Sequence, residues 1–291
     1  MSSWKKSKYL KNLKKIYINE KLKKTSSGYY KNWINHKYKH SIGVMKCAIE
    51  LIEKESKLKA LPDNIKAQMI DSALLHDAGR AFEVDWQTGK ILTMDHGVEG
   101  ARAVFNLGEY SFLTMIAVWV HNKVDESYLL MNNKDFEKTD YFKNLNNENK
   151  VFVKVLRKNF KSLPKKEQEI VLMTAGLVKD ADKVDNFLHF KEMSTIGGLD
   201  SAPKLSRKAF KQLLDGELVR EYKTFLDQMF GIMAWTNDLR FQTSLDWVKK
   251  ENSLKKMKAF CLKQYKKESP ETLNKITRDF DKAIEFLSSK Y

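Results

Sequence analysis

Residues that interrupt helices are scarce in this sequence. Only four prolines and twelve glycines occur among its 291 residues. Long stretches consist of Leu, Lys, Glu, Ala and Met, residue types that favour helices. No series of short alternating apolar segments indicates strands. With 42% hydrophobic and 31% charged residues, the composition predicts a globular all-α fold.

Long apolar runs and paired cysteines are also missing. The longest apolar stretch, around residues 112–120, is much shorter than the roughly 20 residues of a membrane-spanning helix. The basic N-terminus is not followed by the apolar segment of a secretory signal. Cys47 and Cys261 lie far apart and form no metal-binding pair. We therefore expect a reduced, cytoplasmic protein without a membrane span.

Acidic residues are too few to balance the basic ones. The 53 basic and 37 acidic residues give a formal net charge of +16, which favours an anionic partner such as a nucleotide, a nucleic acid or a membrane surface. Only seven of the basic residues are arginines, the type better suited to bidentate phosphate recognition. The charge thus points to an anionic substrate without identifying it.

Basic residues are concentrated at the N-terminus. The first 39 residues include twelve lysines and a single acidic residue. Tyr9, Leu13, Ile16 and Tyr17 recur there at helical spacing. The lysines indicate either a contact with nucleic acid or a membrane, or the solvated face of an appended helix. Because the signal is compositional only, we favour the solvated face.

Apolar periodicity and turn residues predict one helical core with extensions. The predicted regions are a basic helical extension (1–30), a core (31–193) with a polar insertion (124–165), and a C-terminal helical region (194–291). The expected helices cover residues 4–24, 35–58, 64–76, 96–108, 109–121 and 165–190. Loops or irregular segments are expected over residues 25–33, 124–149 and 194–203.

His76 and Asp77 stand together where an apolar helix nears its end. Adjacent side chains on a helix point about 100° apart. Both therefore reach one metal ion only where the helix ends, or where Asp77 bridges two ions. We expect Gly79 to end this helix. Taken alone, the pair is either a metal site or an ordinary helix ending.

Other histidines and an aspartate occupy comparable places in the predicted helices. In chain order the set is His40, His76–Asp77, His96, His121 and Asp182, within the local sequences "HSIGV", "LLHDAGR", "HGVEGA" and "KDADKVDNF". This ordered set, spanning residues 36–190, resembles the HD-domain metal-dependent phosphohydrolase superfamily, whose signature is a histidine, a His-Asp doublet and a distal aspartate. The resemblance implies an HD-domain-like helical bundle with N- and C-terminal helical extensions.

The resemblance also implies the ligands of a metal centre. A first divalent ion would be held by His40, His76, Asp77 and Asp182. A second would be held by His96 and His121, with Asp77 as the bridging carboxylate. Ligands of these types accept Mn²⁺, Fe²⁺, Ni²⁺, Co²⁺, Zn²⁺ or Mg²⁺.

Charged residues beside these ligands are candidates for catalysis and substrate binding. The predicted catalytic residues are Asp77, Arg80 and Lys183, and the predicted substrate contacts are Arg80, Lys123, Lys183 and His36. Each cation is close in sequence to a ligand, and the alternative for each is an ordinary surface charge. His36 lies four residues before His40, on the same helix face.

The neighbours of Asp182 differ in their helical positions. Asp185 is one turn away and is a candidate partner of the ligands in the same cavity. We expect Asp180 to face solvent and assign His189 a structural role.

The resemblance implies a phosphohydrolase or phosphodiesterase that hydrolyses a phosphate ester of a nucleotide-like substrate through a metal-activated water. Its partner would be a small phosphorylated or nucleotide substrate, with nucleic acid as a second candidate. The alternatives are an HD-type nuclease acting on single-stranded nucleic acid, a di-iron oxygenase of the HD fold, and a catalytically silent binding module. The absence of a Gly-Tyr-Pro motif disfavours the cyclic-dinucleotide subgroup.

Overall fold

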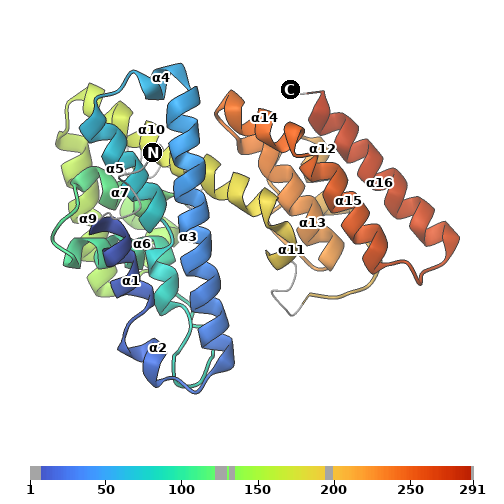
Figure 1. Ribbon diagram of the computed structural model, residues 1–291, viewed down its shortest axis with the longest axis horizontal. Coiled ribbons are helices and arrows are strands. Elements are labelled where there is room, and N and C mark those ends of the chain that lie inside the picture. Colours follow the sequence, from blue (N-terminus) through green and yellow to red (C-terminus); the bar gives the residue numbers. More distant parts are fainter. Residues whose placement is uncertain (1–7, 122–129, 131–134, 194–198, 290–291) are drawn as a thin grey trace. The chain divides into compact units, whose positions relative to one another are not determined.

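A computed structural model describes residues 8–121, 130, 135–193 and 199–289, and every regular element among them is a helix (Figure 1). Two isolated bridges, Val84 with Ile91 and Asp200 with Thr224, are the strand-like pairings of these ranges. The all-α prediction is therefore confirmed. None of the helices in the described part is long and apolar enough to cross a bilayer.

The chain divides into two compact units, Met1–Asp182 and Lys183–Tyr291. The division falls inside helix α10 (Lys165–Leu188), whereas the sequence placed a boundary after residue 193. The basic segment at the N-terminus belongs to the first unit.

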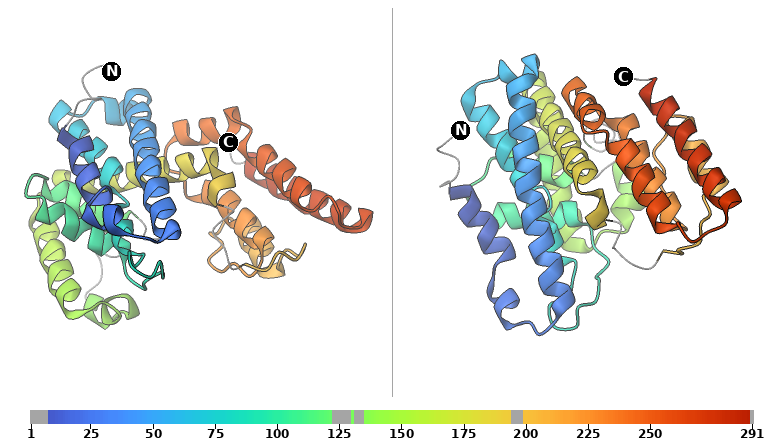
Figure 2. Two further views of the ribbon diagram at one scale, coloured as in Figure 1. Left: turned by 60° about the horizontal axis from the view of Figure 1, so that its bottom comes forward. Right: turned by 45° about the vertical axis from the view of Figure 1, so that its right-hand side comes forward.

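Two long helices, α3 and α10, carry residues of the candidate site in the N-terminal unit. The unit's elements are α1 (Lys8–Tyr17), α2 (Glu20–Lys24), α3 (Gly28–Lys54), α4 (Ser56–Lys59), α5 (Asp63–Leu75), the 3₁₀ helix η2 (Ala78–Phe82), α6 (His96–Asn106), α7 (Phe112–Val120), η4 (Phe136–Lys138), α8 (Asp140–Lys143), α9 (Asn147–Ser162) and most of α10. Figures 1 and 2 show α3 and α5 packed side by side.

Side-chain caps determine where two of the site helices begin. The hydroxyl of Ser27 accepts a backbone N–H bond and starts α3 at Gly28. The loop predicted over residues 25–33 is therefore wrong from Gly28 onward. Asp95 accepts bonds from two backbone N–H groups, so α6 begins at His96 as predicted.

Helix α1 is part of the core of the N-terminal unit. Leu13 and Tyr17 are fully buried and Ile16 nearly so, which confirms the predicted apolar face at these three positions. They pack in a cluster with side chains of α3 and α5. Burial of one large apolar side chain stabilises a fold by about 1.5–3 kcal/mol. Because the lysines between these residues are exposed, the helix combines a core face with a solvated basic face.

The region predicted as a polar insertion, residues 124–165, contains a core helix. Helix α9 buries Val153, Leu156 and Phe160 in a second cluster that includes Trp119 of α7. Of the segment 124–149 that was predicted to be irregular, residues 124–129 and 131–134 lie outside the described residues. The prediction is wrong for much of the rest, which contains η4, α8 and the start of α9.

The C-terminal unit has its own hydrophobic core, in which the rings of Phe230 and Phe280 lie 4.7 Å apart between centroids. Its elements are α11 (Phe190–Met193), α12 (Arg207–Leu214), α13 (Phe225–Ala234), η5 (Trp235–Asp238), α14 (Gln242–Lys250), α15 (Ser253–Gln264) and α16 (Pro270–Ser288). The stretch 233–248 is divided among α13, η5 and α14.

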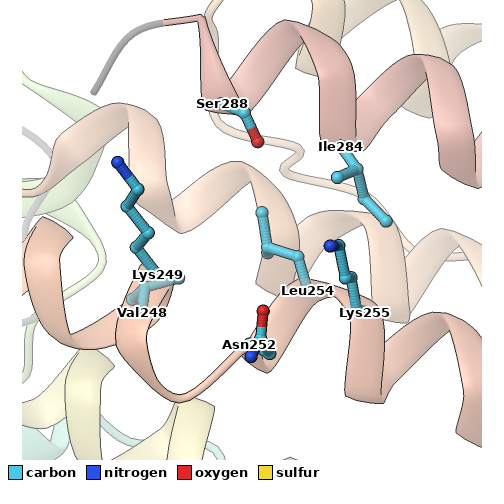
Figure 3. A pocket seen from close by; sticks show the side chains of 7 residues that line it. All are labelled: Val248, Lys249, Asn252, Leu254, Lys255, Ile284 and Ser288. Atoms are coloured by element: carbon cyan, nitrogen blue, oxygen red, sulfur yellow. The ribbon is translucent and has the colours of Figure 1, made fainter.

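A pocket of about 220 Å³ lies among α14, α15 and α16 of this unit (Figure 3). It is lined by Val248, Lys249, Asn252, Leu254, Lys255, Ile284 and Ser288. Asn252 joins α14 to α15 with a φ of 51°, a left-handed conformation that asparagine tolerates better than most residues. None of the residues predicted for the metal centre lines this pocket.

Candidate metal centre

His40 and Asp182 come from the two long helices of the N-terminal unit. His40 lies on α3 and Asp182 on α10. The His40 Nε2 atom is 3.0 Å from an Asp182 carboxylate oxygen. The His40 side chain is only 5% exposed, whereas that of Asp182 is 27% exposed. Residues 142 positions apart in the sequence thus meet at one point.

The His76–Asp77 doublet lies at the junction between two helices. Helix α5 ends at Leu75, His76 is its C-cap, and Asp77 precedes the 3₁₀ helix η2. Because the backbone changes conformation at this point, two adjacent side chains both reach the same cluster of polar groups. Gly79 lies inside η2, so the prediction that it ends the helix is wrong.

Gly79 allows η2 to pack directly against α6. A Cβ atom added at Gly79 would lie 1.9 Å from the backbone oxygen of His96 and 2.7 Å from the backbone nitrogen of Gly100. Only glycine permits this approach, because both neighbours are backbone atoms that cannot rotate away. The close packing brings the start of α6, and with it His96, to the doublet.

His121 approaches the same cluster from the end of α7. It is the C-cap of α7 and is only 3% exposed. Its ring lies 5.1 Å from that of His76 and 5.4 Å from that of His96, between centroids. The imidazole of His121 therefore contacts imidazoles from two other segments.

The Asp77 carboxylate lies between two pairs of histidines. Its Oδ2 atom is 3.6 Å from Nε2 of His76 and 3.8 Å from Nε2 of His40. Its Oδ1 atom is 3.6 Å from Nε2 of His121 and 3.7 Å from Nε2 of His96. Each carboxylate oxygen faces a different pair, which is the arrangement required of a carboxylate that bridges two ions.

Hydrogen bonds orient three of the histidine rings. The Nδ1 atoms of His76 and His121 lie 2.8 and 2.7 Å from the backbone oxygens of Ala73 and Val118. A carbonyl oxygen only accepts, so both Nδ1 atoms must donate. Their Nε2 atoms face the Asp77 carboxylate. The Nδ1 atom of His96 lies 3.2 Å from the Glu83 carboxylate. Such carboxylate and carbonyl partners are typical of metal-binding histidines.

The donor atoms fit divalent metal ions. Two groups, His40/His76/Asp182 and His76/Asp77/His121, each offer three donor atoms within 4.8 Å of one another. Donors at about 2.1 Å from one ion are separated by about 3.0–3.4 Å in octahedral or tetrahedral geometry. The buried His76 Nε2 atom has no hydrogen-bond partner, and an unpaired buried polar atom is costly unless a ligand satisfies it.

Electrostatics keep these ligands in the protonation states that metal binding requires. Burial alone would raise the pKa of Asp77, but Lys37, His76 and Arg80 outweigh it and hold that pKa well below its usual value. Burial likewise opposes ionisation of Asp182, but His40 and His76 lower its pKa. Ionised carboxylates need lose no proton before they bind an ion.

Burial holds His96 and His121 in their neutral forms. Burial lowers the pKa of His121 to about 4. Burial also lowers the pKa of His96, although the carboxylate of Glu83 opposes this shift. At neutral pH both rings are therefore uncharged, and neutral imidazole is the form that binds metals.

Two cations contact the central carboxylate. Arg80 Nε lies 3.3 Å from Asp77 Oδ1, and Arg80 Nη1 donates to Glu83 at 2.6 Å. The ammonium of Lys37 donates to Asp77 Oδ2 at 2.9 Å. Arg80 was predicted for the site, but Lys37 and Glu83 were not. Lys37 lies three residues before His40 on α3, and this spacing was the one available signal; Glu83 had none.

A buried tyrosine supports the doublet from the N-terminal helix. The hydroxyl of Tyr17 on α1 donates to the backbone oxygen of Asp77 at 2.5 Å. Tyr17 is fully buried. The sequence indicated that Tyr17 belongs to an apolar helix face, but nothing in it indicated a contact with a residue 60 positions away.

Three other residues were predicted to contact the substrate, namely His36, Lys183 and Lys123. The ring of His36 stacks on that of His40 at 6.3 Å with an interplanar angle of 5°. The ammonium of Lys183 bonds the carboxylate of Asp238 and lies 3.2 Å from its backbone oxygen. Lys123 lies outside the described residues.

The neighbours of Asp182 on α10 also differ from expectation. Asp180 is completely buried, so the prediction that it faces solvent is wrong. Asp185 is buried and lies 3.4 Å from Nδ1 of His189, whose own side chain is 51% exposed.

All six predicted metal ligands, His40, His76, Asp77, His96, His121 and Asp182, are brought together by the fold. Their identification rests on this geometry and on the order of the residues in the sequence. Comparison of the chain with protein-family models, curated proteins and solved structures found no match.

Proposed function

We propose that this chain is a metal-dependent phosphohydrolase of the HD type that hydrolyses a phosphate ester of a nucleotide-like substrate. The observation that supports this proposal most is the position of Asp77. Its two oxygens face two different pairs of histidines, as a bridging carboxylate between two ions would. A helix ending without a ligand needs no such arrangement.

The residues divide naturally between two ions. His40, His76 and Asp182 would hold one, His96 and His121 the other, and Asp77 would contact both. When bound, divalent ions at this position lower the pKa of a coordinated water and polarise a phosphoryl oxygen. Mixed imidazole and carboxylate donors accept several first-row ions, which leaves the identity of the metal to be measured.

The exposed edge of the cluster indicates where a substrate would enter. The side chains of Asp182 and Arg80 are 27% and 29% exposed, whereas that of Asp77 is 5% exposed. A phosphate approaching from this edge would meet the Arg80 guanidinium, whose planar fork matches two phosphate oxygens. Arg80 would thereby orient the phosphoryl group and offset the negative charge that develops during hydrolysis.

Lys183 and Lys123 remain predicted substrate contacts under this proposal. Lys183 lies next to Asp182 in the chain. A substrate contact would require its ammonium to exchange Asp238 for a phosphate oxygen. His36, stacked on His40, would either touch the substrate or hold the His40 ring in place.

The test is a hydrolysis assay on the full chain loaded with Mn²⁺, using nucleoside monophosphates, nucleoside triphosphates, cyclic nucleotides and single-stranded RNA and DNA. The proposal predicts release of phosphate from a small nucleotide. Cleavage of polynucleotides alone would favour the nuclease alternative. Oxygen uptake by the iron-loaded protein without phosphate release would favour the di-iron oxygenase.

A further inference from the structure

Lys37 is a nearly buried cation in contact with the central carboxylate. Its ammonium lies 2.9 Å from Asp77 Oδ2, and its side chain is 12% exposed. Lysine is seldom buried to this degree unless its charge is paired. Lys37 is on α3 and Arg80 on η2, so the two cations reach opposite oxygens of Asp77 from different helices.

Trp33 is in contact with the segments that carry both cations. The Lys37 ammonium lies 5.4 Å from the centre of a Trp33 ring, within the range of a cation–π interaction. The indole N–H of Trp33 donates to the backbone oxygen of Arg80 at 3.1 Å. One side chain therefore contacts both the Lys37 ammonium and the backbone of Arg80. This contact holds the segments that carry the two cations next to each other, as a ligand that touches both cations would require.

A bound metal ion would change the charge balance of the cluster. Asp77 and Glu83 pair with Lys37 and Arg80, and Asp182 pairs with His40. Each divalent ion that binds would add two positive charges beside Asp77. The carboxylate charge of Asp77 is then shared with the metal, and both cations can attract an added anion.

We propose that Lys37 binds the phosphate of the substrate together with Arg80, and that this pair selects a doubly charged terminal phosphate over a singly charged phosphodiester. This inference rests on the proposed function. Lys37 supplies a compact point charge from α3 and Arg80 a planar fork from η2. In the metal-free protein both cations neutralise Asp77; in the metal-loaded protein their partner is the phosphate.

The test uses isothermal titration of inorganic phosphate into the Mn²⁺-loaded full chain and into Lys37→Met, Lys37→Arg and Lys39→Met proteins. Loss of a charge-assisted contact should weaken phosphate binding about tenfold or more in Lys37→Met. Lys37→Arg should recover part of the affinity because it keeps the charge. The control residue Lys39 is exposed on the same helix, so Lys39→Met should bind phosphate within about twofold of the original protein.

Mn²⁺ affinity separates a substrate contact from a structural role. Lys37→Met should bind Mn²⁺ at least as tightly as the original protein, because Asp77 loses a cation that competes with the metal. If both Mn²⁺ and phosphate affinity fall together, Lys37 is structural and the inference is overturned. Unchanged phosphate binding in Lys37→Met would overturn the inference and leave the proposed function intact. Failure of the original protein to bind Mn²⁺ would overturn both.

Dimethyl phosphate, which carries a single negative charge, tests whether the site prefers a doubly charged phosphate. The original Mn²⁺-loaded protein should bind inorganic phosphate at least tenfold more tightly than dimethyl phosphate near pH 8. Equal affinity for the two anions would contradict selection of a doubly charged terminal phosphate.

Discussion

At the scale of single residues, the candidate centre depends on protonation states that burial and neighbouring charges together determine. The Nδ1 atoms of His76 and His121 are committed to backbone oxygens, which leaves Nε2 as their metal-binding atom. The carboxylates of Asp77 and Asp182 have lowered pKa values. Protons therefore compete little with metal ions at neutral pH. Acid should change the stability of the metal-free protein by protonating these same groups.

His121 should make the stability of the metal-free protein depend on pH. Its pKa is about 4 in the folded chain and about 6.5 when unfolded. Between these values the unfolded chain binds a proton that the folded chain does not. This contribution is complete above pH 6.5 and is lost as the pH falls toward 4, costing about 2–3 kcal/mol at pH 4.5.

Chemical denaturation at pH 7.5 and 4.5 measures this effect. The loss of unfolding free energy between the two pH values should be about 2–3 kcal/mol smaller in His121→Gln than in the original chain. His189→Gln is the matched control, because the His189 side chain is half-exposed. An identical loss in all three proteins would contradict the assignment of a buried neutral His121.

The six candidate ligands were predictable from the sequence, but the residues around them were not. The ligands belong to an ordered set with recognisable neighbours, and Asp95 and Gly108 marked both ends of the helix that His96 begins. Lys37, Glu83 and Tyr17 reach the cluster through the packing of separate segments. Sequence spacing predicts neighbours within one helix but not contacts between helices.

At the scale of elements, the doublet is positioned by the contacts of η2 with α6 and α1. Gly79 lets η2 approach the backbone of α6, and Tyr17 of α1 bonds the residue that precedes η2. The sequence predicted the helices correctly in most places because their apolar spacing is clear. It failed at residues 25–33, where the single hydroxyl of Ser27 lets the chain become helical.

Substitution of Gly79 should loosen the contact between η2 and α6. The methyl group of Gly79→Ala would overlap the backbone oxygen of His96, and such overpacking costs about 1–3 kcal/mol or more. The thermal unfolding temperature and the Mn²⁺ affinity should both decrease, because His96 is displaced from Asp77. Gly28→Ala is the control, since no atom lies within 4 Å of its added Cβ. Equal effects of the two substitutions would count against the close approach.

Tyr17→Phe tests whether α1 supports the centre. The change removes one of the two donors to the Asp77 backbone oxygen, the other being the backbone N–H of Arg80. It should lower the unfolding free energy by about 0.5–1.5 kcal/mol. Mn²⁺ affinity should fall as well, because the doublet is less firmly held. Tyr29→Phe, at a residue that is 45% exposed, should change neither quantity. A Tyr17→Phe protein with unaltered Mn²⁺ affinity would limit α1 to a packing role.

At the scale of the whole molecule, the positive net charge bears on whether the substrate is a small nucleotide or a nucleic acid. The chain carries a formal charge of +16. Among the described residues of α1 and α2, the lysines at positions 11, 14, 15, 21, 23 and 24 are exposed. The sequence indicated this exposure through composition alone. The division inside α10 was not predictable, because the apolar and polar pattern continues through the helix without interruption.

Salt dependence separates a small-nucleotide enzyme from a nuclease. Affinity for a nucleoside monophosphate should change only severalfold between 50 and 200 mM salt, because few charges are exchanged. A polynucleotide contacting six or more lysines would lose about 1,000-fold or more in affinity over the same range. Substrate KM and polynucleotide Kd measured in the two salts give the comparison. A steep salt dependence of catalysis on the preferred substrate would favour the nuclease.

The bridging position of Asp77 is tested most directly by the metal content of the purified full chain after saturation with Mn²⁺ and removal of free metal. Elemental analysis should find about two ions per original chain and almost none in Asp77→Ala, because each Asp77 oxygen faces a different pair of histidines. Asp63→Ala, which alters a 98% exposed carboxylate on α5, should keep both ions. Unchanged metal content in Asp77→Ala, with the helical fold intact by circular dichroism, would contradict the account.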